Sequence, residues 1–117
     1  MKRNKYGVSA PEARTVDGIK FDSKAEATRY QELVLLQRAG EIFELERQPA
    51  FQLVPAFIDK LGKKHQGASY RGDFRYKDKQ GQVIVEDVKG VSTRLYQLKK
   101  KLLLWRYPDI NFVEVKA

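Results

Sequence analysis

The stretch Ser69-Tyr-Arg-Gly-Asp-Phe-Arg-Tyr-Lys-Asp-Lys-Gln-Gly-Gln-Val-Ile-Val-Glu-Asp-Val-Lys89 predicts a β-hairpin. Its two ends alternate between apolar and polar residues, and Asp78-Lys-Gln-Gly81 between them is typical of a tight turn. We expect residues 79–81 to form a three-residue loop in which Gly81 takes the left-handed conformation. Asp78 then pairs with Gln82, and this pair sets the register of both strands.

Counting back from that pair places Asp73 directly opposite Asp87. Opposed side chains in a sheet have Cβ atoms about 4.5–5.5 Å apart, and like charges at that spacing are destabilising. Lys89 lies two residues further on the same face, so the arrangement indicates a site for a divalent cation and the chemistry of a metal-dependent phosphodiesterase. With a two-residue turn, Glu86 instead of Asp87 would share the face of Asp73.

The ordinary alternative is two exposed charges on a solvated face of the sheet. The opposed register favours a cation, because a repulsive pair would otherwise remain there. Lys89, by itself an ordinary lysine at a strand end, could beside two carboxylates and a metal orient or deprotonate a water or offset transition-state charge. Arg71 is expected opposite Lys89, where it could contact phosphate.

A first helix is predicted over residues 23–39, with Ser23 as its N-cap and Gly40 ending it. Ser23-Lys-Ala-Glu26 has the pattern of a capping box, which alone would explain Glu26. On a helical wheel, however, Glu26 falls in the sector that should face the sheet, where a carboxylate is costly unless it is paired or bound to metal. The local sequence supports both explanations equally.

The chain has 117 residues and a net charge of +8, which indicate one soluble domain and a polyanionic partner, with nucleic acid first. Basic residues that could contact the phosphate backbone without reading bases occur along the chain. They are Lys2, Arg3, Lys5, Lys60, Lys63, Lys64, His65 and Lys99.

The composition also limits the chemistry. There is no cysteine and His65 is the only histidine, so a metal would be held by carboxylates and backbone oxygens, which suits Mg²⁺ or Mn²⁺. No apolar run reaches the ~18 residues of a membrane span. The N-terminus has no secretory pattern, and we expect a cytoplasmic protein without a membrane partner.

The rest of the chain predicts an α/β fold, with a basic N-terminal arm over residues 1–18 and a single domain over residues 19–117. A strand region over 42–54, interrupted near Pro49, is followed by a loop over 55–68 and then the hairpin. A second helix over 93–106 and a strand over 111–115 complete the order helix, three strands, helix, strand. The apolar face of the second helix, expected in the core with Lys99 beside it, comprises Leu95, Leu98, Leu102 and Trp105.

These residues resemble a known family. A helix with Glu26, then Tyr70-x-x-Asp73-Phe74 and Glu86-Asp-Val-Lys89-Gly90, is similar to the PD-(D/E)xK nuclease superfamily, with Gly72 where the motif's name has proline. The closer similarity, over residues 18–26 and 86–90, is to small phage and prophage endonuclease-like proteins. The resemblance covers about residues 19–117 and implies a restriction-endonuclease-like αβββαβ core with a mixed sheet flanked by helices.

The resemblance implies that Glu26, Asp73 and Asp87 bind one or two Mg²⁺ or Mn²⁺ ions, with the Val88 backbone carbonyl as a further ligand, and that Lys89 assists the water. The expected activity is that of a DNA endonuclease producing 5′-phosphate and 3′-hydroxyl ends in phage or prophage recombination, repair or replication, in the bacterial host's cytosol. Some such proteins resolve branched DNA such as Holliday junctions, often as homodimers. The alternatives are a non-catalytic basic DNA-binding accessory protein and a basic RNA- or protein-assembly factor.

Overall fold

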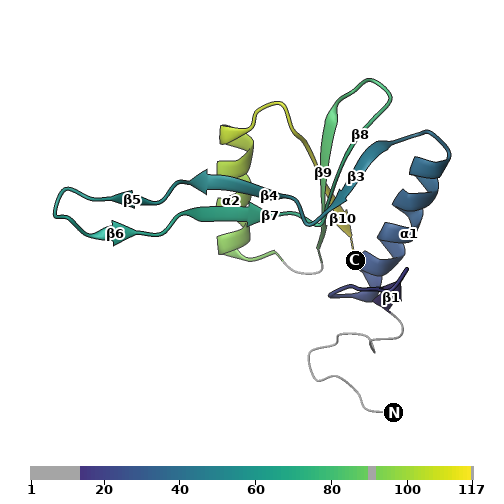
Figure 1. Cartoon of the computed structure of the whole chain (residues 1–117), viewed down its shortest axis with the longest axis horizontal. Coiled ribbons are helices and arrows are strands. Elements are labelled where there is room, and N and C mark those ends of the chain that lie inside the picture. Colours follow the sequence, from purple (N-terminus) through teal and green to yellow (C-terminus); the bar gives the residue numbers. More distant parts are fainter. Residues whose placement is uncertain (1–13, 90–91, 117) are drawn as a thin grey trace, which may run out of the picture.

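A four-stranded mixed sheet forms the centre of the fold (Figure 1). The structure, a computed structural model, describes residues 14–89 and 92–116. The strands run in the order β10 (Asn111–Lys116), β9 (Val83–Lys89), β8 (Phe74–Lys77) and β3 (Phe43–Arg47). β3, β8 and β9 pair antiparallel, and β10 pairs parallel to β9.

Two helices flank this sheet. Helix α1 (Lys24–Arg38) begins after Ser23, whose side chain accepts a hydrogen bond from the Glu26 backbone N–H. Helix α2 (Arg94–Arg106) is the crossover between β9 and β10 and begins after Thr93, which caps it in the same way. Both N-caps satisfy backbone donors that the first helical turn leaves free. The predicted limits of both helices are therefore confirmed to within a residue.

Each face of the sheet has its own core, because alternate residues of β8 and β9 point to opposite sides. On the α1 side the buried residues are Phe21, Ala27, Leu33, Ile42, Phe74, Tyr76 and Val88. On the α2 side they are Phe51, Leu53, Tyr70, Val85, Tyr96 and Leu103. Val85 and Phe74 are almost fully buried, so the middle of the β8–β9 hairpin is enclosed from both sides.

The predicted buried face of α2 is wrong except at Leu102, which is half-buried against the core on the α2 side. Tyr96 and Leu103 are the buried residues of this helix, whereas Leu95, Leu98 and Trp105 are 62%, 53% and 77% exposed. Leucines occur on several sides of α2, so its apolar pattern does not select one face. The packing against β4 and β7 selects the side that carries Tyr96.

The register of the β8–β9 hairpin is confirmed. Phe74 pairs with Glu86 and Lys77 with Val83, and the Asp78 N–H bonds the Gln82 carbonyl at 3.0 Å. Gly81 has φ of +79°, the left-handed conformation that the three-residue loop requires.

The strand that was expected to run from Ser69 to Tyr76 is broken in two, and this part of the prediction is wrong. β7 (Ala68–Arg71) pairs with β4 (Ala50–Val54), and the chain turns at Gly72 before β8 begins. Arg71 therefore pairs with Ala50 and is not in the ladder with Lys89. A Cβ at Gly72 would lie 3.1 Å from Val85 Cγ1, so glycine allows this close crossing.

Residues 50–71 form a β-arm that extends away from the sheet (Figure 1). Beyond β4 and β7 it contains β5 (Phe57–Ile58) and β6 (Lys64–His65), which pair antiparallel. The prediction of a loop over 55–68 is therefore wrong, because short strands occur there, although the interruption near Pro49 is confirmed. A small hairpin of β1 (Thr15–Val16) and β2 (Ile19–Lys20) precedes α1.

The architecture is thus mixed α/β, with two helices around a mixed sheet and additional antiparallel strand pairs. The sheet and its helices follow the order α1, β3, β8, β9, α2, β10. Within the described ranges, neither helix has the length and apolar character needed to cross a membrane.

Candidate active site

Asp73 and Asp87 lie at the end of the β8–β9 hairpin that is remote from its turn. The Asp73 N–H donates to the Glu86 carbonyl at 3.0 Å, and Asp73 Oδ2 accepts a 2.6 Å hydrogen bond from the Val88 N–H. These two bonds hold the residue before β8 against β9. The Asp87 carboxylate lies close enough to Asp73 to raise the pKa of its carboxyl, so the two acids meet as the register predicts.

Asp87 is 4% exposed and contacts Tyr70 and Lys89 on the α2 side of the sheet. The Tyr70 hydroxyl donates a hydrogen bond to its Oδ2, and Lys89 Nζ lies 3.6 Å from its Oδ1. The same ammonium lies 4.0 Å from the centroid of the Tyr96 ring. An ammonium held between a carboxylate and an aromatic face has restricted positions, so Lys89 stays beside Asp87.

Glu86 points to the opposite face, and the alternative in which it shares the face of Asp73 is wrong. Its carboxylate is 1% exposed and accepts two 2.7 Å hydrogen bonds from the Arg29 guanidinium, a bidentate ion pair. Tyr76 donates a further hydrogen bond to it. Glu86 is therefore a structural group of the α1 core, and Asp87 is the acid beside Asp73.

Glu26 is in the first turn of α1 and is half-buried. Burial raises the pKa of Glu26, and the negative charges of Asp22 and Asp87 raise it further, while Arg47 opposes them. The Glu26 backbone N–H also donates to the Ser23 side chain, so Glu26 belongs to the helix cap and lies among the acids at the same time. The three predicted acids thus interact electrostatically at one end of the sheet.

The pKa of Asp73 is raised to about 7, mainly by burial and with a smaller contribution from the negative charges of Glu26 and Asp87. A hydrogen bond from the Val88 N–H opposes this shift. A cation at this site would offset the negative charges around Asp73 and would therefore favour the ionised form of its carboxyl.

The carboxylate and carbonyl oxygens at this end of the sheet are ligands that suit a hard divalent cation. Among residues 14–89 and 92–116, no three His, Cys, Asp or Glu side chains are already gathered closely enough to hold a metal ion. Mg²⁺, however, usually keeps several waters and takes only one or two protein carboxylates, which Asp73 and Asp87 can supply. The N–H and C=O of a residue in a strand point to the same side, so the Val88 carbonyl lies on the Asp73 side of β9.

The predicted basic contacts are distributed over three places. Lys60, Lys63 and Lys64 lie on the arm, Arg71 is exposed at the arm's base, and Lys99 is half-buried on α2. Lys100, next to Lys99 on α2, bonds Glu114 of β10 at 2.7 Å. Lys2, Arg3 and Lys5 lie outside the described residues.

Sequence reasoning missed the contributions of Tyr70, Tyr96 and Arg47. The spacing of three between Tyr70 and Asp73 in Tyr70-x-x-Asp73 was the signal that could have indicated a shared site. No local pattern links Tyr96 to Lys89 or Arg47 to Glu26, because these pairs come from separate elements. The Nε atom of Arg47 is buried without a hydrogen-bond partner.

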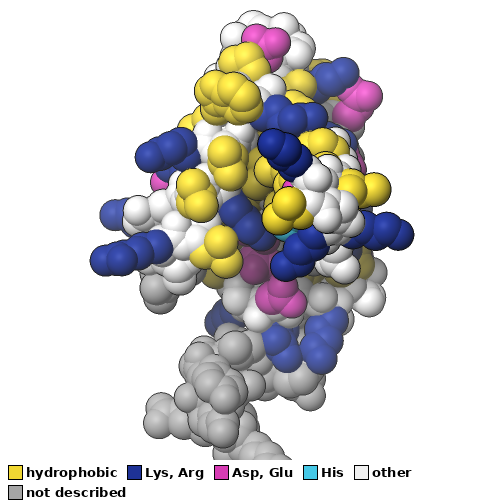
Figure 2. Space-filling view, turned by 90° about the vertical axis from the view of Figure 1, so that its left-hand side faces the viewer, with side chains coloured by type: hydrophobic (Ala, Val, Ile, Leu, Met, Phe, Trp, Pro, Cys, Tyr) yellow, Lys and Arg dark blue, Asp and Glu magenta, His cyan; other side chains and the backbone are white. Residues whose placement is uncertain are grey.

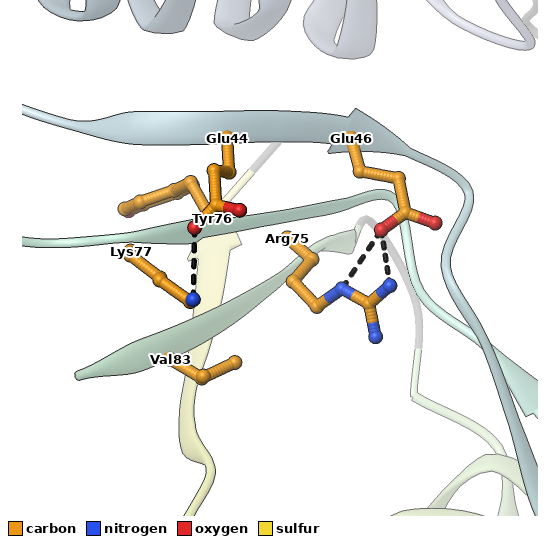
Figure 3. Close-up of a pocket in the computed structure, with 6 residues that line it drawn as sticks. All are labelled: Glu44, Glu46, Arg75, Tyr76, Lys77 and Val83. Carbon is orange, nitrogen blue, oxygen red and sulfur yellow. Dashed lines mark hydrogen bonds and ion pairs between the residues drawn. The ribbon is translucent and has the colours of Figure 1, made fainter. Parts of the chain in front are cut away.

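A separate hollow lies at the turn end of the hairpin (Figure 3). Its charged groups pair with one another: Arg75 Nε bonds Glu46 at 2.9 Å, and Lys77 bonds Glu44 at 2.8 Å. Because these charges already pair with one another, this hollow is not the candidate site.

No curated protein and no solved structure matches this chain. A family description does match, over residues 3–117, and it reads "Protein of unknown function (DUF1064)". The match spans the arm, both helices and the acidic site, and the chain therefore belongs to the DUF1064 family.

Proposed function

We propose that this protein is a Mg²⁺-dependent DNA endonuclease that hydrolyses phosphodiester bonds. The observation that carries the proposal is the meeting of Asp73 and Asp87 at one end of the hairpin, with Lys89 3.6 Å from Asp87. One buried and one half-buried acid with an ammonium beside them are the groups that a metal-assisted phosphodiesterase needs. The similarity to the PD-(D/E)xK motif supports the same assignment.

Asp73 and Asp87 would hold the ion, with the Val88 carbonyl and Glu26 as further ligands. When bound, Mg²⁺ or Mn²⁺ polarises the scissile phosphate and lowers the pKa of a coordinated water. Tyr70 donates to Asp87 and fixes the orientation of its carboxylate. Lys89, placed between Asp87 and the Tyr96 ring, orients the attacking water or offsets charge on the phosphate in the transition state.

The basic side chains would bind the DNA backbone on either side of this centre. Arg71 lies on the strand that carries Tyr70, and Arg47 is close enough to Glu26 to affect its pKa. Such contacts position a duplex without reading its sequence. The net charge of +8 supports a polyanionic substrate.

The finer expectations come from the family resemblance. They are cleavage to 5′-phosphate and 3′-hydroxyl ends, action on branched DNA such as Holliday junctions during phage or prophage recombination, repair or replication, and a homodimer. Product analysis on labelled junctions tests the first two, and light scattering after gel filtration tests the last.

The decisive experiment is cleavage of a labelled panel comprising linear duplex, single strand, flap and four-way junction. The proposal predicts cutting with Mg²⁺, none with EDTA, and none by Asp73→Ala protein. Asp109→Ala, a change at an exposed acid after α2, is the matched control and should cut like the wild type.

The alternative is a non-catalytic DNA-binding accessory protein, which the same positive charge favours. It predicts salt-sensitive binding without cutting in Mg²⁺ or Mn²⁺, unchanged in Asp73→Ala protein. That combination of results would replace the nuclease proposal.

A further inference from the structure

The outer part of the β-arm has almost no buried residues. Between Val54 and Ser69 every residue is exposed except Asp59 and His65, which are half-buried. The base of the arm, β4 and β7, packs against α2. A projection of this length that contributes little to either core suggests a role in binding, because protruding segments with few buried contacts are where functional residues concentrate.

The tip of the arm is held in one shape by Asp59. Its carboxylate accepts hydrogen bonds from the Leu61 N–H at 2.9 Å and the Lys63 N–H at 3.0 Å, and it bonds His65 Nε2 at 2.8 Å. His65 in turn stacks on Phe57 with ring centroids 4.7 Å apart. Gly62 completes the turn with φ of +82°. The tip is therefore ordered before any partner binds.

This ordered turn exposes an apolar side chain among cations. Leu61 is 92% exposed at the tip, and Ile58 is 64% exposed beside it. Lys60, Lys63 and Lys64 are also exposed, whereas Asp59, the arm's acid, has its carboxylate engaged within the turn. Figure 2, which faces the tip of the arm, shows hydrophobic and Lys or Arg side chains interspersed on this side. Lysines that flank an apolar wedge match the charge and chemistry of a nucleic-acid groove.

The arm also has a fixed relation to the acidic site, because Tyr70 near its base bonds Asp87. Leu61 lies nine positions before Tyr70 in the chain. At about 3.3 Å per extended residue the tip lies roughly 30 Å from that base, close to one turn of a DNA duplex. A duplex that lies over the site and along the arm would therefore reach Leu61 about one turn from the cleaved bond.

We propose that the arm tip is a DNA wedge: Lys60, Lys63 and Lys64 bind phosphates across a groove, and Leu61 inserts at an unpaired or weakly stacked base step. Insertion costs unstacking free energy, which is smallest where the duplex is already interrupted. The tip thus selects DNA with a local distortion about one turn from the scissile phosphate. This inference rests on the proposed nuclease function and specifies its substrate.

The test measures binding in EDTA, so that cutting plays no part. Full-length wild type and Leu61→Ala protein are titrated into a labelled duplex of about three helical turns with one unpaired base, and into its fully paired equivalent. Leu35→Ala, at a leucine of α1 that is 62% exposed, is the matched control. We expect Leu61→Ala to weaken binding to the interrupted duplex about tenfold and to leave the paired duplex within about twofold.

Two further measurements sharpen the result. Replacing Lys63 or Lys64 with Ala should weaken binding to both duplexes and reduce the slope of log affinity against log salt by about one. A 2-aminopurine beside the unpaired base should brighten when wild type binds and stay dim with Leu61→Ala protein. The wedge proposal would be overturned if the wild type bound the interrupted and the paired duplex equally well and Leu61→Ala protein bound both with the same affinity as the wild type.

A change of oligomeric state in Leu61→Ala protein, measured by light scattering, would assign the tip to a protein contact and also overturn the wedge. Failure of the nuclease proposal is a separate result. It would appear as no cutting in Mg²⁺, whatever the binding measured in EDTA.

Discussion

The Val88 backbone N–H donates a 2.6 Å hydrogen bond to Asp73 Oδ2. The Asp73 carboxylate is therefore positioned directly by the backbone of β9, without an intervening flexible side chain. Asp87 immediately precedes Val88 in the chain, so the same short segment of β9 supplies one acid and orients the other. A site built on paired strands in this way is more rigid than one built on loops.

The elevated pKa of Asp73 predicts that this residue destabilises the metal-free protein increasingly as the pH rises. The folded state holds this proton until about pH 7, whereas the ordinary carboxyl pKa is 3.8. Between these values the unfolded chain binds fewer protons than the folded one, so stability falls with rising pH and levels off above pH 7. Asp73→Asn protein in EDTA should therefore be more stable than wild type, by a margin that grows through this range.

The measurement is urea denaturation at several pH values, with Asp109→Asn as the control for removing a negative charge. The control should show no such growing margin. A margin for Asp73→Asn that stays constant between about pH 4 and pH 7 would contradict the burial and repulsion assigned to Asp73.

Arg29→Met should destabilise the fold by about 3–5 kcal/mol, because it leaves the Glu86 carboxylate buried without its cation. Denaturation by urea measures the loss. Adding Glu86→Gln to this variant should recover much of it, since the uncompensated charge is then gone. Arg38→Met, at the exposed end of α1, is the control and should change stability by less than about 1 kcal/mol.

Tyr70→Phe removes the hydroxyl that bonds Asp87 and keeps the ring in the core. We expect about a tenfold loss in apparent Mg²⁺ affinity or cleavage rate, as for other groups that orient a metal ligand, with little change in melting temperature. Tyr107→Phe removes a hydroxyl that bonds the Gln52 carbonyl at 2.9 Å, and it should leave cleavage unchanged. Equal activity of the two variants would show that Tyr70 only packs.

Lys89→Met should lower the cleavage rate at saturating Mg²⁺ and DNA while leaving Mg²⁺ affinity nearly unchanged, because the ammonium acts on the water or phosphate. Lys100→Met removes an ammonium of α2 that bonds Glu114 and serves as the control. Single-turnover kinetics with separate Mg²⁺ titrations distinguish the two effects. A fall in metal affinity alone for Lys89→Met would contradict this role.

The hairpin and both helix limits could be predicted because local chemistry determines them. The Gly81 turn fixes the register that brings Asp73 to Asp87, and Ser23 and Thr93 cap their helices within three residues of sequence. A tight turn or a helix cap depends only on neighbouring residues, so it can be predicted before the fold is known.

The errors arose where distant segments decide the outcome. The buried face of α2 depends on contact with β4 and β7, and the leucines of α2 do not encode it. The break at Gly72 follows from a close crossing over Val85. The arm's outer strands are short and exposed, so they lack alternation, and the hydrogen bonds of Asp59 hold the tip instead. Tyr70 and Tyr96 were missed as site residues for the same reason.

Two neighbouring carboxylates give the most direct test of the account. Asp87→Asn and Glu86→Gln change adjacent residues by the same chemistry, yet Asp87 faces Asp73 and Glu86 faces Arg29. We predict that Mg²⁺-dependent cleavage of DNA is lost in Asp87→Asn protein and retained, with a lower melting temperature, in Glu86→Gln protein. Cleavage that survives Asp87→Asn, or that is absent from the wild type with every DNA in the panel, would contradict the proposed site.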